Sequence, residues 1–483
     1  MAFLVGGANS ASGAYEIDNS LRFNDADTPS LTLDLSGGAG NRKTWTASFW
    51  FKLGNMDSSG VSNQRFLSAN TSHSDADYGQ IGLGSGDYLE FGTGTQIWRR
   101  TNRLFRDPSA WYHIVVAMDT TQGTASNRVK IYVNGVQETS FAISNDPTQD
   151  ADYGIMGAVS HAIGKTEVSS QTDNETFDGY MAEWHFIDGS ALAETEFGET
   201  NDNGVWIPKA YSGSYGTNGF FLEFQETGTS QNSSGIGADT SGEDNHWAVT
   251  NLASTDVTTD TPTNNFATLN PLIPQTRTPT YSEGNLKFDY NQTNSSYHAM
   301  GVSTVGLSTG KWYWEVELDA IPGYAQIGIL GDQTTHILGN PADDDNYVGY
   351  HSRGYAFQHN GGNSYNNNAS SSFGGNNTVA GDINNFALDM DNHKLYYGIN
   401  GTWQNSGDPT SGATGTGALA ISNDQSLYFP AVSGEDANWI CNFGNPPFAI
   451  SSGNADANGY GNFEYAVPSG YYALCTKNLA EYG

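Results

Sequence analysis

The chain has 483 residues, with 19 Lys and Arg against 52 Asp and Glu, which gives a formal net charge of −33. Charged residues make up 15% of it and aromatic residues 12%, a balance typical of a folded protein with an acidic surface and not of an acidic disordered tail. So few cations leave no basic patch for a phosphate backbone, and we therefore expect no nucleic acid among its partners.

Alternating apolar residues run through most of the chain and predict β-strands. Val, Ile and Val share one face of residues 129–133, and Trp, Trp, Val and Leu share one face of residues 312–318. Asn134-Gly135 and Asn400-Gly401 follow such strands and suit the two positive-φ positions of a type I′ hairpin turn. With 58 Gly and no short repeat, this pattern favours β-sandwiches.

Helical periodicity is nearly absent. Residues 190–197 (SALAETEF) form the one helix-like piece, with a Ser cap and a following Glu. The longest apolar runs, such as residues 111–118, are far shorter than the roughly 18–20 residues that a membrane-spanning helix needs. The start of the chain lacks the positive region and long apolar core of a secretory signal. We therefore expect assembly in the cytosol, or release by a route other than the general secretory one, without membrane insertion.

The composition changes between residues 211 and 280, where Ser, Thr, Asn and Asp dominate and Pro recurs at positions 262, 271, 274 and 279. Because Pro fixes φ and lacks an N–H donor, this stretch predicts an extended connector. We therefore predict an all-β chain with one sandwich at residues 1–211, a connector with one strand at 212–280, and a second sandwich with a C-terminal extension at 281–483.

The two cysteines, Cys441 and Cys475, lie in apolar runs, which predicts buried reduced thiols. The sequence holds no CxxC pair and no Cys/His cluster, so it does not indicate a structural zinc.

Three runs carry a resemblance of the first half to laminin-G/concanavalin A-like jelly rolls. They are NRKTWTASFWFKL at 41–53, AWYHIVVAM at 110–118 leading into VKIYVNG at 129–135, and FDGYMAEWHFI at 177–187. The resemblance covers most of residues 20–200 and implies a two-sheet lectin-like sandwich.

The second half resembles a SPRY domain over residues 284–446. The runs that carry this resemblance stand in the order of that family: KWYWEVEL at 311–318, AQIGIL at 325–330, YVGY at 347–350, FALDMDNHKLYY at 386–397, YFPAV at 428–432 and NWICNFG at 438–444. SPRY domains share the concanavalin-like sandwich, so both halves are expected to be variants of one architecture.

The whole chain also resembles virion proteins of marine tailed bacteriophages. NSASG at 9–13, DNSLRF at 18–23 and DTPTNNFATLNP at 260–271 contribute to this resemblance. It implies a tail-fibre, head-fibre or decoration protein that reaches the virion in the host cytoplasm and leaves by lysis.

Glycoside hydrolases on the same jelly roll need paired carboxylates, supplied in that family by an E-x-D-x-x-E strand. Glu317-Leu-Asp319 and Glu16-Ile-Asp18 begin such a pattern, but the third carboxylate is missing in both. The SPRY match places Glu315 and Glu317 on an exposed strand face. No nucleophile elbow, zinc motif or phosphate loop is present, so we expect no enzymatic activity and no organic cofactor.

The ten histidines are scattered along the chain. His113 lies two residues after Trp111 in an apolar strand, which predicts a satisfied, partly buried side chain and not a catalytic base. His298, His351 and His359 stand in polar segments of the SPRY-like half, where we expect surface positions.

Calcium is the cofactor that the acidic turns favour, since Ca²⁺ takes several carboxylate and carbonyl oxygens. Laminin-G-like domains often hold calcium at one rim of the sandwich, although solvated acidic turns explain the same residues. The candidate ligands are Asp75, Asp77, Asp173, Asn174, Asp343, Asp344 and Asp345.

Glycan sites combine an aromatic face with polar groups that bond sugar hydroxyls. Trp98 suits such a site and a core position equally, whereas Trp45, Phe49, Phe51, Trp312 and Trp314 alternate as core residues. The polar loop at 361–375 is the preferred contact site of the second half, although a disordered insert or a subunit contact would explain it too. The candidate residues are Tyr78, Trp98, Tyr365, Asn366, Asn367 and Phe373.

The leading hypothesis is therefore a non-enzymatic virion protein whose lectin-like domains bind host-surface glycan or neighbouring virion proteins. One alternative is a purely structural fibre or decoration protein that self-assembles as a homo-oligomer, with part of the large aromatic content lining the subunit interfaces. A second alternative is a glycan hydrolase that uses Glu317 or Glu183.

Overall fold

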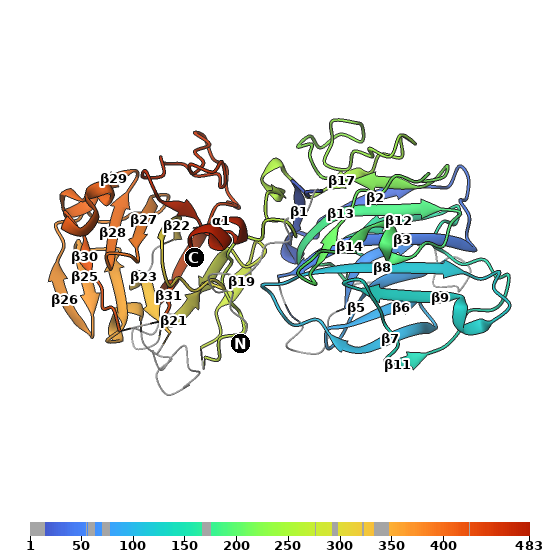
Figure 1. Cartoon of the computed structure of the whole chain (residues 1–483), viewed down its shortest axis with the longest axis horizontal. Helices are drawn as coiled ribbons and strands as arrows, with labels where there is room; N and C mark the ends of the chain where they lie inside the picture. Colours follow the sequence, from blue (N-terminus) through green and yellow to red (C-terminus); the bar gives the residue numbers. More distant parts are fainter. Residues whose placement is uncertain are drawn as a thin grey trace. The chain divides into compact units, whose positions relative to one another are not determined.

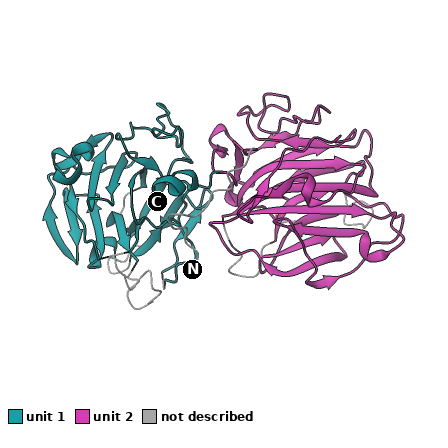
Figure 2. Cartoon of the chain, viewed as in Figure 1, with its two compact units in different colours: residues 1–10, 264–483 teal, residues 11–263 magenta. Residues whose placement is uncertain are grey.

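The computed structural model describes residues 15–54, 56, 63–69, 78–166, 175–275, 277–291, 298–320, 323–332, 347–424 and 426–483. Contacts within the chain divide it into two units (Figure 2). The N-terminal unit comprises residues 11–263, and the C-terminal unit comprises residues 264–483 together with residues 1–10. None of the helices among the described residues has the length and apolar character needed to cross a membrane.

Two antiparallel sheets, each of eight strands among the described residues, build the N-terminal unit (Figure 1). The first sheet has the order β10 (Val136–Gln137), β9 (Val129–Val133), β8 (Trp111–Asp119), β3 (Thr44–Leu53), β13 (Gly179–Asp188), β1 (Ser20–Phe23) and β18 (Val257–Thr258), and β16 (Phe220–Leu222) also pairs with β13. The second sheet has the order β11 (Phe141–Ser144), β7 (Ile97–Leu104), β6 (Tyr88–Gly92), β5 (Gly79–Gly84), β4 (Gln64–Ala69), β12 (Ser160–Ile163), β2 (Ser30–Asp34) and β17 (Ala248–Thr250). A small ribbon pairs β14 (Gly198–Thr200) with β15 (Trp206–Pro208).

The C-terminal unit is also a pair of sheets. One sheet has the order β19 (Thr280–Ser282), β20 (Lys287–Tyr290), β32 (Ala437–Asn442), β22 (Lys311–Ala320), β27 (Ile383–Asp389), β28 (Lys394–Ile399) and β29 (Thr402–Trp403), with β30 (Leu419–Ala420) on β28 and β33 (Tyr472–Ala473) parallel to β22. The other sheet has the order β21 (Ala299–Val302), β31 (Tyr428–Gly434), β23 (Ala325–Gly331), β24 (Gly354–Gln358), β25 (Asn363–Asn366) and β26 (Ala369–Ser372).

Helical structure is short throughout the described ranges. The 3-10 turns are η1 (Asp25–Asp27), η2 (Ala125–Asn127), η3 (Glu194–Glu196), η4 (Ser254–Asp256), η6 (Val348–Tyr350), η7 (Gln404–Ser406) and η8 (Pro409–Thr414). The α-helix α1 (Thr476–Tyr482) follows β33 near the end of the chain.

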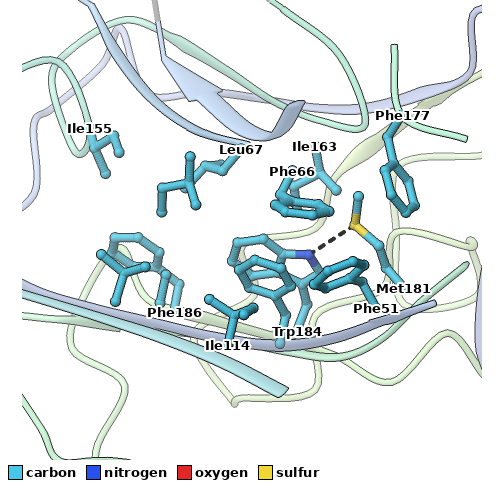
Figure 3. Close-up of a cluster of buried hydrophobic side chains, with 14 of the residues drawn as sticks. Phe51, Phe66, Leu67, Ile114, Ile155, Ile163, Phe177, Met181, Trp184 and Phe186 are labelled. Carbon is cyan, nitrogen blue, oxygen red and sulfur yellow. Dashed lines mark hydrogen bonds between the residues drawn. The ribbon is translucent and has the colours of Figure 1, made fainter. Parts of the chain in front are cut away.

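The period-two pattern of the strands fills the space between the sheets with aromatic side chains. Phe49 of β3 lies 5.0 Å from Phe66 of the opposite sheet and 4.4 Å from Trp184 of β13, measured between ring centroids. Figure 3 shows Trp184 at the centre of this core, where its indole N–H donates to the Met181 sulfur at 3.3 Å. Trp45, Phe49, Phe51, Trp312 and Trp314 are all at most 1% exposed, so their predicted core positions are confirmed.

The predicted hairpin turns and thiols are also confirmed. Asn134 and Gly135 have φ of 47° and 76°, and Asn400 and Gly401 have φ of 49° and 74°. Cys441 and Cys475 are buried free cysteines, and burial raises the pKa of the Cys475 thiol to about 12.

The stretch expected to be a connector joins the N-terminal sandwich as far as residue 263. It contributes β16, β17 and β18 to the two sheets. Asp260 forms a buried ion pair with Lys52 at 2.8 Å, and its other carboxylate oxygen accepts from the Trp111 indole at 3.2 Å. Some polar residues of this stretch, such as Asp260, therefore have buried partners, whereas others are exposed, and the structure draws the boundary between the units at residues 263 and 264.

The helix expected at residues 190–197 is wrong, because only Glu194–Glu196 turn and they do so as the 3-10 helix η3. The chain before it is tied to β3 instead: the Thr46 hydroxyl donates to the Ser190 carbonyl at 2.8 Å and accepts from the Leu192 N–H at 2.8 Å. This contact holds the segment on the outer face of the first sheet.

Candidate functional site

Two of the predicted glycan-binding aromatics lie in the core of the N-terminal unit. Trp98 is 1% exposed, and its ring packs 5.0 Å from Phe91 and 4.5 Å from Tyr153. Tyr78 is 3% exposed, and its hydroxyl donates to the Gln80 side chain at 2.5 Å. Neither ring is available to stack on a sugar, because both side chains are buried.

The predicted calcium ligands lie outside the described residues. These are Asp75, Asp77, Asp173, Asn174, Asp343, Asp344 and Asp345. Glu175, which follows one of these turns, is described, and its carboxylate pairs with Arg65 at 2.8 Å and accepts from Thr166 at 2.6 Å. Within the described ranges no three His, Cys, Asp or Glu side chains gather as a metal site.

The polar loop predicted at residues 361–375 is a hairpin made of β25 and β26. Phe373, which follows it, is 5% exposed and packs 4.8 Å from Phe357, so it belongs to the core and not to a binding surface. Tyr365 lies on β25 opposite Ala356 of β24 and is half-buried. Of the predicted residues in this loop, Tyr365, Asn366 and Asn367 thus stand at the surface.

Tyr365 belongs to a cluster of four tyrosines, here called the tyrosine rim: Tyr324, Tyr347, Tyr350 and Tyr365. The Tyr347 ring is at its centre, 5.1 Å from Tyr324, 6.0 Å from Tyr350 and 6.1 Å from Tyr365. Tyr350 is 39% exposed, and the other three are half-buried. The rim therefore presents several aromatic rings to solvent at differing angles.

The rim is assembled from three elements that meet because of a glycine and a glutamine. Tyr324 precedes β23, Tyr347 and Tyr350 flank η6, and Tyr365 lies on β25. A Cβ atom on Gly349 would stand 2.4 Å from the Tyr365 Cβ, so only glycine lets η6 approach β25. The buried Gln326 side chain accepts from the Gly349 N–H at 2.9 Å and donates to the Tyr324 hydroxyl at 2.7 Å.

Asparagine side chains border the rim. The Tyr347 hydroxyl donates to the Asn368 side-chain oxygen at 2.5 Å. Asn367 and Asn368 form the turn between β25 and β26 with φ of 53° and 57°, and both are exposed. The Asn366 amide donates to the Gly354 carbonyl at 2.9 Å, so it braces the hairpin instead of facing a ligand.

Two phenols of the rim, those of Tyr324 and Tyr347, are held neutral by burial. Burial raises the pKa of Tyr324 and of Tyr347 above the ordinary value of about 10.

Two histidines lie next to the rim. The His298 ring is 5.3 Å from the Tyr347 ring, and the His351 ring is 5.8 Å from the Tyr350 ring, measured between centroids. The expected surface positions of His298, His351 and His359 are wrong, because these side chains are only 9%, 8% and 6% exposed.

The carboxylate of Glu315 is 0% exposed, so its expected place on an exposed face is also wrong. It accepts from the backbone N–H groups of Glu464 at 2.9 Å and Tyr465 at 2.8 Å, and from the Tyr313 hydroxyl at 2.9 Å. The residues after β32 fold back over the sheet, and Glu315 fastens them there. Burial raises its pKa, although these hydrogen bonds oppose the shift.

Glu183, the residue named for the hydrolase alternative, belongs to a buried network on β13. Glu183 has φ of 53° beside a register shift between β13 and β3, and bulges of this kind redirect side chains. Its carboxylate accepts from the Tyr15 hydroxyl and stands 3.3 Å from His185 Nε2, while His185 Nδ1 is 2.8 Å from the Tyr215 hydroxyl. Glu183 is 5% exposed and His185 is 2% exposed, so the network is buried and links Tyr15 and Tyr215 to β13.

His113 matches its prediction of a satisfied, buried histidine. It is 1% exposed, its Nε2 stands 2.9 Å from the Ser48 hydroxyl, and its Nδ1 accepts from the Trp206 indole at 3.0 Å. Burial, followed by the nearby His185, lowers its pKa to about 3.

Comparison with known families agrees with this architecture in both units. Residues 25–197 match the concanavalin A-like lectin/glucanases superfamily, and residues 311–443 match the SPRY domain. The chain contains a concanavalin A-like domain and a SPRY domain. The combination expected from the sequence is thus confirmed, and each match falls within one of the two sandwiches.

Solved structures similar to parts of the chain have low sequence identity. The SPRY domain of human HERC1 is 15% identical over 36% of this chain and 96% of its own, with a TM-score of 0.27. A human SPRY domain is 15% identical over 34% and 94%, with a TM-score of 0.24. The heptameric SAP-like pentraxin from Limulus polyphemus is 16% identical over 37% and 80%, with a TM-score of 0.27. No curated protein matches the chain.

Proposed function

We propose that the chain is a non-enzymatic virion protein of a bacteriophage, a tail fibre, head fibre or decoration protein, that binds host-surface glycan through the tyrosine rim of its SPRY domain. The observation that carries the binding proposal is the contact of four tyrosine rings at an exposed edge, with Tyr347 at the centre. The virion part rests on the resemblance of the whole chain to phage virion proteins.

The chemistry of the rim suits sugars. A tyrosine ring offers a flat apolar face to the C–H groups of a pyranose, and its hydroxyl bonds the ring substituents. The exposed Asn367 and Asn368 at the adjoining turn add amide donors and acceptors. Rings fixed by Gly349 and Gln326 lose little conformational entropy when a ligand binds.

The non-enzymatic part of the proposal is supported by the engagement of the described carboxylates. Asp319, which shares a strand face with Glu317 and lies near it, is held in an ion pair with Lys287 at 2.7 Å. Glu315 and Glu183 are buried in hydrogen-bonded networks. The proposal includes no organic cofactor and no nucleic acid partner. It includes Ca²⁺ as an ion bound by the acidic turns.

Binding is tested by glycan-array and host-cell adsorption assays with the full chain and the variants Tyr347→Ala and Tyr350→Ser. We expect both variants to lose glycan binding and adsorption. Tyr482→Ser is the matched control, because Tyr482 is a partly exposed tyrosine of the same unit that stacks on Tyr472 outside the rim. Wild-type protein that binds no glycan, with or without calcium, refutes the glycan part.

Self-assembly is the second candidate, and one feature favours it. β26 is the edge strand of its sheet, and all four of its residues are exposed. Unpaired backbone groups at such an edge can add a strand from another chain. Light scattering over a concentration series decides between a homo-oligomer and a monomer. Ser370→Pro in β26 should lower the association constant if this edge pairs, because Ser370 and Tyr365 form a non-hydrogen-bonded pair and the Ser370 N–H points away from β25.

A further inference from the structure

The concanavalin A-like domain has a hollow of about 240 Å³ on the outer face of its first sheet, far along the chain from the tyrosine rim. Its floor is made by the outward side chains of two paired strands, Ala117 and Asp119 from β8 and Lys130 and Tyr132 from β9. Lys130 pairs opposite Ala117 in the ladder, and residues two apart in a strand share a face, so these four side chains stand together.

Small side chains keep the hollow open. Ala117 lies beneath it, and Ala191 and Ala193 line its wall on either side of Leu192. The wall is held in place by the two hydrogen bonds of Thr46 to the backbone of residues 190 and 192. Because the wall is fixed from β3, the hollow is part of the folded domain and not a gap beside a free loop.

Unused hydrogen-bonding groups face this space. Lys130 and Asn127 line the hollow, and among the described residues neither the Lys130 ammonium nor the Asn127 side-chain amide makes a hydrogen bond or an ion pair. Most cations of this acidic chain are paired, as Arg100 is with Glu90 and Arg106 with Asp87. An ammonium left without a carboxylate beside a shaped hollow is a donor available to a ligand.

Asp119 supplies the matching acceptor. Its two carboxylate oxygens accept from the Thr121 hydroxyl at 2.6 Å and from the Gln122 amide at 2.6 Å. Burial opposes ionisation, but these hydrogen bonds prevail and lower the pKa of Asp119. The carboxylate is therefore ionised and held rigid. Its Oδ1 already accepts from the Thr121 hydroxyl, the Thr121 N–H and the Thr44 hydroxyl, whereas Oδ2 accepts from Gln122 and keeps a lone pair for a ligand hydroxyl.

We propose that this hollow binds a single neutral pyranose ring, with Lys130 donating to and Asp119 accepting from its hydroxyl groups and Leu192 against its apolar face. The volume is below the roughly 300–1,000 Å³ of sites for drug-sized ligands, which suits one ring. The negative charge of Asp119 repels a carboxylated sugar. Glu194 adds a second negative charge near the hollow, since it contributes, after burial, to the raised pKa of Tyr132.

This inference rests on the proposed glycan-binding function and gives the chain a second sugar site on its other domain. Two sites on one chain raise the avidity for a surface that repeats the same glycan, without any new contact at either site.

The test is saturation-transfer NMR on the full chain with the methyl glycosides of glucose, galactose and mannose and with methyl glucuronide. We expect at least one neutral glycoside to bind and Lys130→Met to weaken its binding about tenfold or more, the usual effect of losing a charged hydrogen bond. Lys209→Met is the matched control, because Lys209 is an exposed lysine of the same domain that bonds only the Thr195 carbonyl. Ala117→Leu, which fills the hollow, should abolish the same signal, and thermal melting checks that it folds.

Three results would overturn the inference: no neutral glycoside binds, Lys130→Met leaves binding unchanged, or methyl glucuronide binds more tightly than every neutral glycoside. The rim variant Tyr347→Ala separates this inference from the proposed function. If glycan binding depends on Tyr347 and not on Lys130, the hollow is not a sugar site while the function stands. If it depends on Lys130 and not on Tyr347, the rim is wrong and the hollow remains.

Discussion

Acid should destabilise the concanavalin A-like domain through two buried histidines. His113 is enclosed between the rings of Trp50 and Trp206, 4.7 Å and 6.0 Å away, and its pKa is lowered to about 3 by burial and by His185. His161 is 1% exposed and its Nε2 accepts from the Met156 N–H at 3.0 Å. Burial lowers its pKa to about 4, against the opposing effects of the Val159 carbonyl and Asp34.

The direction follows from which state takes up the proton. In the unfolded chain each histidine has a pKa of about 6.5. Below that pH the unfolded state binds a proton that the folded state does not bind, and this protonation lowers the free energy of unfolding. The stabilisation is complete above pH 6.5 and is lost as the pH falls toward 3 for His113 and toward 4 for His161. Between pH 7.5 and pH 5 each histidine should cost about 2 kcal/mol, or about 4 kcal/mol together.

The assay is urea unfolding of the full chain at a series of pH values, followed by tryptophan fluorescence. Other groups titrate in the same range, so the decisive quantity is the difference between wild type and His113→Gln. The glutamine variant will be less stable at pH 7.5, but its free energy of unfolding should fall about 2 kcal/mol less on going to pH 5. Between pH 7.5 and pH 8.5 the two curves should run parallel. If they run parallel down to pH 5 as well, His113 is not held neutral by the fold and the reasoning is refuted.

Three further predictions concern the buried charges and calcium. In Glu315→Gln the side-chain amide nitrogen faces one of the two backbone N–H groups, of Glu464 or Tyr465, that the carboxylate accepts from, so the free energy of unfolding should fall by about 2–4 kcal/mol. Proteolysis after residue 444 should then be faster, and an unchanged cleavage rate would contradict the anchoring role. Lys52→Met leaves the Asp260 carboxylate buried without its cation and should cost about 3–5 kcal/mol in urea unfolding, whereas Lys52→Met with Asp260→Leu should recover most of the loss. Equal losses in the single and double variants would show that the charge itself is not the cause. If Ca²⁺ occupies the acidic turns, excess chelator should lower the melting temperature, and an unchanged melting temperature would count against calcium.

Part of the candidate site was predictable and part was not. Tyr365 and Asn367 were found because a polar, glycine-flanked segment between strands reaches the surface. Phe373 sits in the same segment but is buried, because the hairpin closes and returns it to the core. Tyr324, Tyr347 and Tyr350 come from two other elements, and only the close approach of η6 to β25 makes one surface of them.

The buried charges were also not predictable from the sequence, because residues expected at the surface are covered by distant segments. Glu315 alternates with core residues and was expected to face solvent, yet the chain 149 residues later folds over it and supplies its donors. Asp260 stands in a Pro-containing polar stretch that looks solvated until Lys52, 208 residues earlier, is placed beside it. Polar residues at a strand face leave the same pattern whether water or a later segment covers them.

The sequence by itself determined the class of this protein: alternating residues made strands, Asn-Gly pairs made turns, and aromatic residues at period two filled two sandwich cores. These signals are local, because strand periodicity and turn geometry depend on neighbours a few residues away. The tertiary structure alone decided which polar residues are exposed, which tyrosines meet in the rim, and where small side chains leave a hollow beside Lys130. Those outcomes depend on contacts between segments far apart in the chain, which composition and spacing do not encode.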